Sequence, residues 1–210
     1  MYESALGLFE KARKIRVQLG ADAIAPLAVT YMTTGRAYFL KGIYPEAMDS
    51  YKKAEEIFME IFGPKGHFMA HLNYAYGNLR RAQNMEDAKY FYQEACNILE
   101  DDTPCHFLRA ACFYKIACLS SKLGDSKTAL ELLEKALGIS KLREAAGDTA
   151  RVLRKKADIL FGGTEDDKQQ ANLLLSQVQS ILAGQAGNII FDPEHETEDE
   201  WDNWVCPYWR

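Results

Sequence analysis

The stretch Ala47-Met48-Asp49-Ser50-Tyr51-Lys52-Lys53-Ala54 decides the fold, because its pattern of small, aromatic and small residues recurs along the chain. The pattern has a small residue at i, an aromatic or aliphatic one at i+4 and a small one at i+7, which share one face of a helix. The other copies are Ala5, Phe9, Ala12; Ala88, Tyr92, Ala95; Ala129, Leu133, Ala136; and Ala171, Leu175, Val178. Their leading alanines lie 42, 41, 41 and 42 residues apart, so the sequence predicts stacked helical repeats.

Glycine and proline turns interrupt the helical periodicity often enough to fit two helices into each period. The first four expected helices cover about residues 3–19, 26–40, 45–62 and 67–81. The next ones are a segment through Ala88 and Ala95 with Asn84 as its N-cap, a segment through Phe113 and Cys118, and residues 126–146. Gly147 and Asp148 are expected to form a break, followed by a helix that ends near Phe161 and a last one that ends near Leu182. The fold expected is therefore all-α, with about nine helices and no sheet.

Two regions differ in pattern. Residues 1–184 form the expected array, which begins with half a repeat, and residues 185–210 form a tail in which the helical periodicity stops. Of the 25 basic and 30 acidic residues, seven acids lie between 192 and 202 and one base is Arg210, which leaves 24 bases and 23 acids before the tail. A neutral body without a basic block argues against nucleic acid as a partner.

The five cysteines are odd in number and lack the paired spacings of a zinc site or a disulfide framework. No apolar run is long enough to span a bilayer, and the amino terminus lacks the pattern of a signal peptide. We therefore expect a reducing, cytoplasmic location, with no membrane partner and no cofactor.

In each period, a first helix with a small residue at its centre precedes the helix that carries the repeated pattern. These central residues are Gly35, Gly77, Ala117 and Ala157. The arrangement resembles the tetratricopeptide repeat (TPR), and its long period is similar to kinesin light chain and the MalT-like sensor arrays. The best-matched segment runs from Gly35 through Gly42 and Pro45 to Ala54. The resemblance implies a right-handed superhelix that binds a partner in its concave groove, lined by the first helix of each pair.

Offsets of −6, −3, +1 and +4 from each central residue share a helical face, and we expect this face to line the groove. Aromatic and basic residues dominate it: Arg36, His71, Tyr74, Asn78, Arg81, Tyr114, Arg151 and Arg154. Arginine forks and tyrosine rings suit carboxylates and aromatic side chains, so the expected partner is a protein or peptide that is acidic or aromatic. The alternative interpretation is that these are ordinary surface residues of a scaffold.

Two narrower sites are possible from the sequence. Asn78, Lys115, Arg151 and Lys155 are placed as in repeat domains that clamp a terminal carboxylate, although Tyr74 and Lys115 differ in type from that pattern. His67 and His71 are spaced i, i+4 and could share a metal with His106 or Cys105, but no acidic residue accompanies them, and surface or packing histidines are the preferred interpretation. No metal site is assigned.

No phosphate loop, nucleophile elbow or paired-carboxylate motif is present, so no catalytic residue is assigned. The sequence favours an interaction module, as a separate protein or as the recognition region of a larger sensor-like assembly. The competing hypothesis is an enzyme without a known motif, or a small-molecule-binding protein, that uses Tyr74, His71 or Arg154 in the groove.

Two surfaces are expected to be covered. The first helix exposes Leu8, Phe9, Ala12 and Ile15, which a second copy of the chain or an upstream domain would cover, because terminal repeats need a polar cap. The tail combines its seven acids with Trp201, Trp204, Tyr208 and Trp209, and we expect it to fold back on the array. It would act there either as a permanent cap or as a displaceable ligand of the groove.

Overall fold

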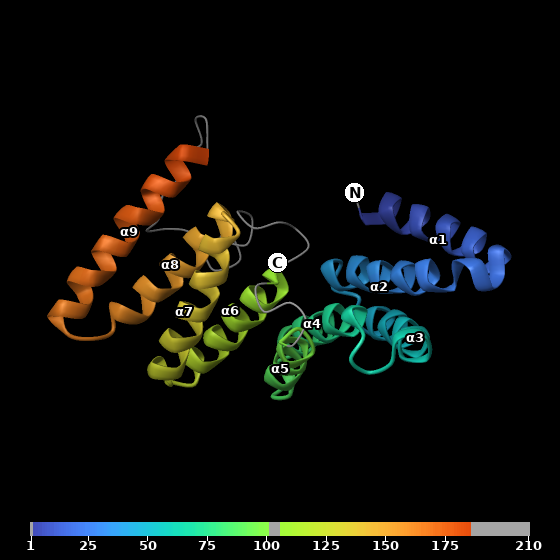
Figure 1. The fold of residues 1–210 in the computed structure, drawn as a ribbon, viewed down its shortest axis with the longest axis horizontal. Helices are drawn as coiled ribbons and strands as arrows, with labels where there is room; N and C mark the ends of the chain where they lie inside the picture. The colour runs from blue at the N-terminus through green and yellow to red at the C-terminus, as the bar shows by residue number, and fades with distance from the viewer. Residues whose placement is uncertain (1, 101–105, 186–210) are drawn as a thin grey trace. The chain divides into compact units, whose positions relative to one another are not determined.

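The computed structural model describes residues 2–100 and 106–185, and in these residues all regular secondary structure is helical (Figure 1). It contains nine α-helices and one short 3-10 turn within the described ranges, which confirms the predicted all-α architecture. The chain divides into two compact units, Met1–Asp102 (unit 1) and Thr103–Arg210 (unit 2), which are described separately.

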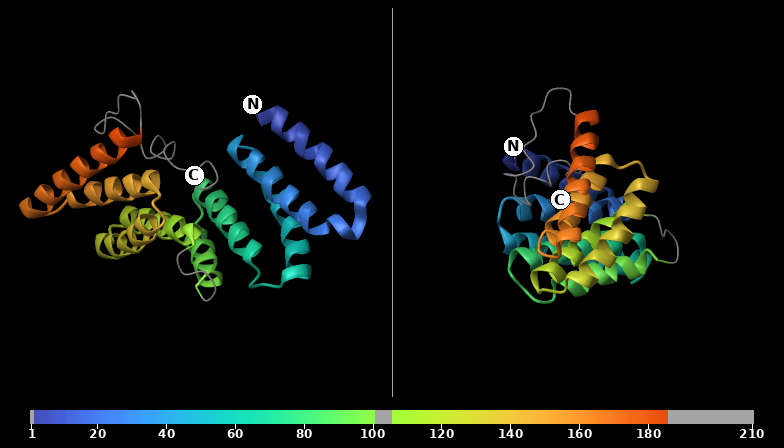
Figure 2. Two further views of the ribbon diagram at one scale, coloured as in Figure 1. Left: turned by 45° about the horizontal axis from the view of Figure 1, so that its top comes forward. Right: turned by 90° about the vertical axis from the view of Figure 1, so that its left-hand side faces the viewer.

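Unit 1 contains five α-helices joined by short turns. In chain order they are α1 (Tyr2–Leu19), the 3-10 turn η1 (Gly20–Ala23), α2 (Ile24–Leu40), α3 (Tyr44–Phe62), α4 (His67–Ala82) and α5 (Ala88–Ile98). Helices α2 and α3 pack as an antiparallel pair, as do α4 and α5, and α1 packs on α2 (Figures 1 and 2). Within residues 2–100, unit 1 therefore consists of two complete helix pairs preceded by a single helix.

Unit 2 contains two further pairs. They are α6 (Phe107–Lys122) with α7 (Ser126–Leu142), and α8 (Ala146–Leu160) with α9 (Glu165–Gln185). One continuous core joins the four helices, since Ala117, Leu133, Leu153 and Val178 all belong to it.

The repeated residues form the cores. Ala47, Ala54, Ala95, Ala136 and their counterparts in the second helix of each pair are at most 1% exposed. Opposite them lie the small residues of the first helices. A β-carbon added to Gly35 would stand 2.6 Å from the ring of Tyr51, and one added to Gly77 would stand 2.6 Å from the ring of Tyr92. In unit 2 the corresponding residues are Ala117 and Leu133, both fully buried. A methyl group thus occurs where the facing side chain is aliphatic, and glycine where it is tyrosine.

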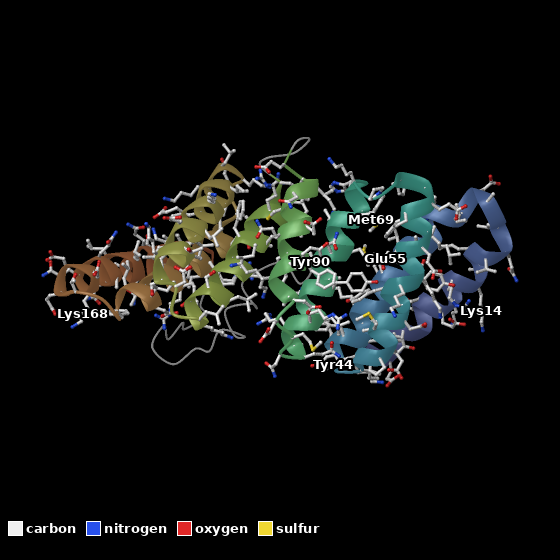
Figure 3. The ribbon with its side chains drawn as sticks, turned by 90° about the horizontal axis from the view of Figure 1, so that it is seen from below. Lys14, Tyr44, Glu55, Met69, Tyr90 and Lys168 are labelled. Atoms are coloured by element: carbon white, nitrogen blue, oxygen red, sulfur yellow. The ribbon has the colours of Figure 1, made fainter. Side chains whose placement is uncertain are left out.

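A second contact links neighbouring pairs in unit 1. The Tyr76 hydroxyl on α4 donates a hydrogen bond of 2.8 Å to Oε2 of Glu55 on α3, a residue labelled in Figure 3. Burial, followed by this bond, raises the pKa of Tyr76 well above its ordinary value. The phenol therefore stays protonated and acts as a fixed donor between α3 and α4.

The turns between paired helices share one geometry. Gly42, Asn84 and Gly124 all have positive φ, and the amide of the next residue bonds back five positions, for example from Met85 N to the Arg80 oxygen at 2.9 Å. This is the left-handed end of a helix, which glycine and asparagine tolerate best. The prediction that Asn84 caps the next helix was therefore wrong, because Asn84 ends α4 instead. It follows Gly77 by seven residues, the same spacing by which Gly42 follows Gly35.

The sequence also misplaced the boundary between α7 and α8. A single helix was expected over 126–146, but α7 ends at Leu142 because Glu144 takes a left-handed conformation with φ 53°. Helix α8 begins at Ala146 and includes Asp148 in its first turn, where the helix dipole and a carboxylate interact favourably. The expected break at Gly147 and Asp148 is therefore the start of a helix.

Candidate functional site: the first helices of the pairs

The residues predicted to line a groove occur in both units, on the first helix of each pair. Arg36 lies on α2, His71, Tyr74, Asn78 and Arg81 lie on α4, Tyr114 lies on α6, and Arg151 and Arg154 lie on α8. Each unit therefore presents aromatic and basic side chains on these helices, and unit 1 adds the amide of Asn78. Several of them are much more buried than residues of an open surface.

In unit 1, the polar residues of α4 pack against α5. Tyr74 and Asn78 are 3% and 7% exposed. The Tyr92 hydroxyl on α5 donates to Oδ1 of Asn78 at 2.8 Å, and the rings of Tyr74 and Tyr92 lie 5.6 Å apart. This buried hydrogen bond links the polar side chain of Asn78 on α4 to α5. Arg36 and Arg81 remain partly exposed.

His67 and His71 form a direct contact in the first turn of α4. Their Nε2 atoms lie 3.0 Å apart and their ring centroids 4.8 Å apart, so one imidazole donates a hydrogen bond to the other. The i, i+4 spacing brings the two rings together as expected.

In unit 2, an arginine is stacked on a tyrosine. The guanidinium carbon of Arg151 lies 4.3 Å from the centre of the Tyr114 ring, and Arg151 is only 1% exposed. Its Nη2 lies 3.1 Å from Oδ1 of Asp148, one turn earlier on α8. Lys115, also buried, places its Nζ 5.9 Å from the same ring. We call Tyr114, Lys115, Asp148 and Arg151 the Tyr114–Arg151 cluster.

The cluster combines two cations and one carboxylate around one aromatic ring. The guanidinium is planar and stacks on the electron-rich face of tyrosine, while its five N–H groups lie in the guanidinium plane and can meet carboxylates. Sequence reasoning identified Tyr114, Lys115 and Arg151 but assigned Asp148 to a loop. Its position three residues before Arg151 was the available signal, because residues at i and i+3 meet on a helix surface.

Arg154 lies in a different environment from Arg151. It forms an ion pair of 2.6 Å with Asp158, one turn later on the same helix, and its side chain is 17% exposed. Lys156 is buried and forms an ion pair with Glu134 on α7. Arg151, Arg154 and Lys156 of α8 are thus each paired with an acid of unit 2.

Two expectations concern surfaces that the described residues leave open. Leu8 and Ile15 on α1 are 64% and 57% exposed, whereas Phe9 and Ala12 are half-buried. That another element covers this face stays a prediction. Trp201, Trp204, Tyr208 and Trp209 lie outside the described residues.

Among the helices that the structure describes, none is long and apolar enough to cross a membrane. No protein-family model matches the chain, and no curated protein matches it.

Solved structures with the same fold were found. BtubC (BKLC) from P. vanneervenii matches with a TM-score of 0.75 at 18% identity, over 91% of this chain and 77% of that one. Two structures of P. anserina repeats, described as kinesin light chain nearly identical TPR-like repeats, match with TM-scores of 0.65 and 0.63. Their identities are 20% and 19%, over 88% and 89% of this chain and 88% and 90% of theirs. The chain therefore has the TPR-like fold of kinesin-light-chain-type repeats, as its motifs predicted.

Proposed function

We propose that the chain is a protein-binding module whose partner is a peptide segment rich in carboxylates and aromatic side chains, recognised by the first helices of the pairs. TPR-like helical repeats are scaffolds that generally mediate protein interactions, which supports this class of function. The observation that carries the proposal is the Tyr114–Arg151 cluster, because its chemistry selects the partner.

Burial of cations separates this cluster from an ordinary helix surface. Removing a charged group from water is unfavourable by several kcal/mol unless carboxylates and hydrogen bonds compensate for it. Lys115 and Arg151 are 3% and 1% exposed, so a role in packing alone would be served better by apolar residues of similar size. A site that recognises carboxylates does require cations at fixed positions, and an arginine held by a ring and an aspartate has a fixed fork.

Unit 1 supplies a related set on α4. Tyr74 and Asn78 are fixed by Tyr92, and Arg81 follows Asn78 by three residues on the same face. Arg81 is partly exposed, so its guanidinium can bind the carboxylates of an extended segment. Buried tyrosine and arginine are also the residues in which binding energy most often concentrates.

Selection of peptides from a random displayed library on the immobilised chain tests the proposal. We expect enrichment of peptides with Asp or Glu next to Trp, Tyr or Phe. The affinity for an enriched peptide should be lower in the Arg81→Ala variant. It should also be lower in the Arg151→Lys variant, which keeps the charge but loses the guanidinium fork and its stacking on the Tyr114 ring. Lys127→Ala, an exposed cation on α7, is the control, and circular dichroism checks that each variant folds. Enrichment of basic or purely aliphatic peptides would contradict the proposal.

The tail of this chain has the same chemistry as the proposed partner, since residues 192–202 carry seven acids next to three tryptophans and a tyrosine. We propose that it competes for the first helices. Truncation after Ile190 should then raise the affinity for an enriched peptide without lowering the stability of the chain. Loss of stability would instead identify the tail as a permanent cap, and unchanged affinity and stability would refute docking altogether.

A further inference from the structure

A pocket of about 380 Å³ lies among α1, α2 and α3 in unit 1. None of its lining residues belongs to the helical face that was predicted to line the groove. Its walls come from Leu6, Glu10 and Arg13 on α1, from a row of α2 that includes Tyr31 and Tyr38, and from polar residues of α3 that begin at Glu46. Five of the lining residues are charged. The pocket is therefore polar, and its charges indicate what it can bind.

The two cations of the pocket are engaged by acids of their own helices. Arg13 donates to both carboxylate oxygens of Glu10, from Nε and Nη2 at 2.7 Å each, and Lys53 donates to Asp49 at 2.6 Å. Lys14, labelled in Figure 3, lies 3.8 Å from the same Glu10 carboxylate. Hydrogen bonds to Glu10 and then Tyr31 raise the pKa of Arg13, and the bond to Asp49 raises the pKa of Lys53. An incoming anion would have to displace one of these carboxylates.

A third carboxylate is left for a ligand. Glu46 stands in the first turn of α3 and forms no ion pair within residues 2–100 and 106–185. Glu10, Glu46 and Asp49 against Arg13 and Lys53 give the lining a net charge of −1. Electrostatic complementarity therefore favours a cation.

The aromatic wall points to the same ligand. Tyr31 and Tyr38 are seven residues apart on α2 and so lie on nearly the same side of the helix. Lys53 already places its Nζ 6.0 Å from the centre of the Tyr31 ring, so this ring is oriented to meet a cation. Rings of this kind attract ammonium and guanidinium groups within about 6 Å.

We propose that this pocket binds an ammonium or guanidinium group on an alkyl chain, with Glu46 as its counter-ion and Tyr38 beside its alkyl stem. The source is either a lysine or arginine side chain of a peptide or a free alkyl cation, that is, an alkylamine or an alkylguanidine. The site is separate from the one under Proposed function, which selects carboxylates, so the two can fail independently.

The test is an NMR titration of the full chain with three probes: acetyl-Gly-Arg-Gly-amide, butylguanidinium, and acetyl-Gly-Gln-Gly-amide as the neutral control. We expect saturable shifts of α1, α2 and α3 signals with a cationic probe and none with the glutamine peptide. Binding of both cationic probes, or of the arginine peptide alone, identifies a peptide side chain as a source, and binding of butylguanidinium alone identifies a free alkyl cation.

Glu46→Gln should weaken cation binding about fivefold, the effect of losing one exposed ion pair. Glu60→Gln removes the same charge from the exposed part of α3 outside the pocket and should have no effect. Equal weakening by the two variants, saturable binding of the glutamine peptide, or no saturable binding of either cationic probe would overturn the proposal.

Discussion

Replacing Gly35 with alanine tests whether the contact between paired helices is as close as the structure shows. The new β-carbon would stand 2.6 Å from Cδ1 and Cε1 of Tyr51 and 3.0 Å from the backbone oxygen of Ala47. Tyr51 cannot easily move, because it is 1% exposed and its ring packs edge-on against Tyr76 at 5.5 Å. The variant therefore forces either α2 away from α3 or the ring out of its rotamer.

Two effects of opposite sign decide the magnitude. Alanine in place of glycine inside a helix stabilises by about 0.5–1 kcal/mol. Overpacking a dense core costs about 1–3 kcal/mol. We therefore expect Gly35→Ala to lower the free energy of unfolding by about 1–2 kcal/mol. Controls are Gly7→Ala in α1 and Gly138→Ala in α7. At both positions the added β-carbon would meet no atom within 4 Å beyond the local helix backbone, so both substitutions should be stabilising.

A double variant isolates the contact. Gly35→Ala with Tyr51→Leu reproduces the pairing of Ala117 with Leu133 in unit 2, so the methyl group would occupy space that the ring has left. Urea unfolding followed by circular dichroism, with hydrogen exchange of α2 and α3 amides as the local measure, should give a coupling energy of about 1–2 kcal/mol. If Gly35→Ala were as stabilising as Gly7→Ala, or if the two changes were additive, the argument would be refuted.

The other predictions concern a helix cap, a strained turn and a buried hydrogen bond. Thr164 and Asp167 bond reciprocally at the start of α9, so Thr164→Ala should lower stability by about 1 kcal/mol in urea unfolding. These bonds lower the pKa of Asp167, so the stability that they contribute is present above the ordinary carboxyl pKa and is lost as the pH falls through the lowered pKa. Acidification should therefore reduce the stability of Thr164→Ala less than that of the unchanged chain. Glu144→Gly should raise the unfolding temperature, since relief of about 1–2 kcal/mol at a left-handed residue exceeds the entropy cost of glycine. Tyr92→Phe, which removes the donor to Asn78, should destabilise by about 1 kcal/mol in the same urea assay, and an unchanged midpoint would show that the bond contributes nothing.

Periodicity predicted the fold because it reports which face of each helix is buried. Ala47, Tyr51 and Ala54 are at most 1% exposed, and the same holds for Ala88, Tyr92 and Ala95. Boundaries were harder, because they depend on single residues. Asn84 was interpreted as a cap on general propensity, although its place seven residues after Gly77 matches Gly42 and Gly124. The repeat itself therefore contained the information that the local rule missed.

The candidate sites were only partly predictable. A helical face gives the direction of a side chain relative to its own helix, but not what the next helix places over it. Tyr74 and Asn78 were thus assigned to an open face, whereas α5 covers them through Tyr92. The pocket of unit 1 combines residues of three helices, and no single stretch shows that Glu10 and Glu46 line the same space.

Helix α2 shows how one helix can contribute to two proposed sites, one that prefers cations and one that prefers anions. At 100° per residue, Tyr38 lies about 20° from Tyr31 around the helix axis, whereas Arg36 lies about 140° away. The tyrosines line a pocket of net negative charge, and Arg36 belongs to the face rich in arginine. Because the two faces point in different directions, a partner peptide could present an acidic segment to one and a basic side chain to the other. Changes at Arg36 and Glu46 should then act independently on the two interactions, since the two residues belong to different faces.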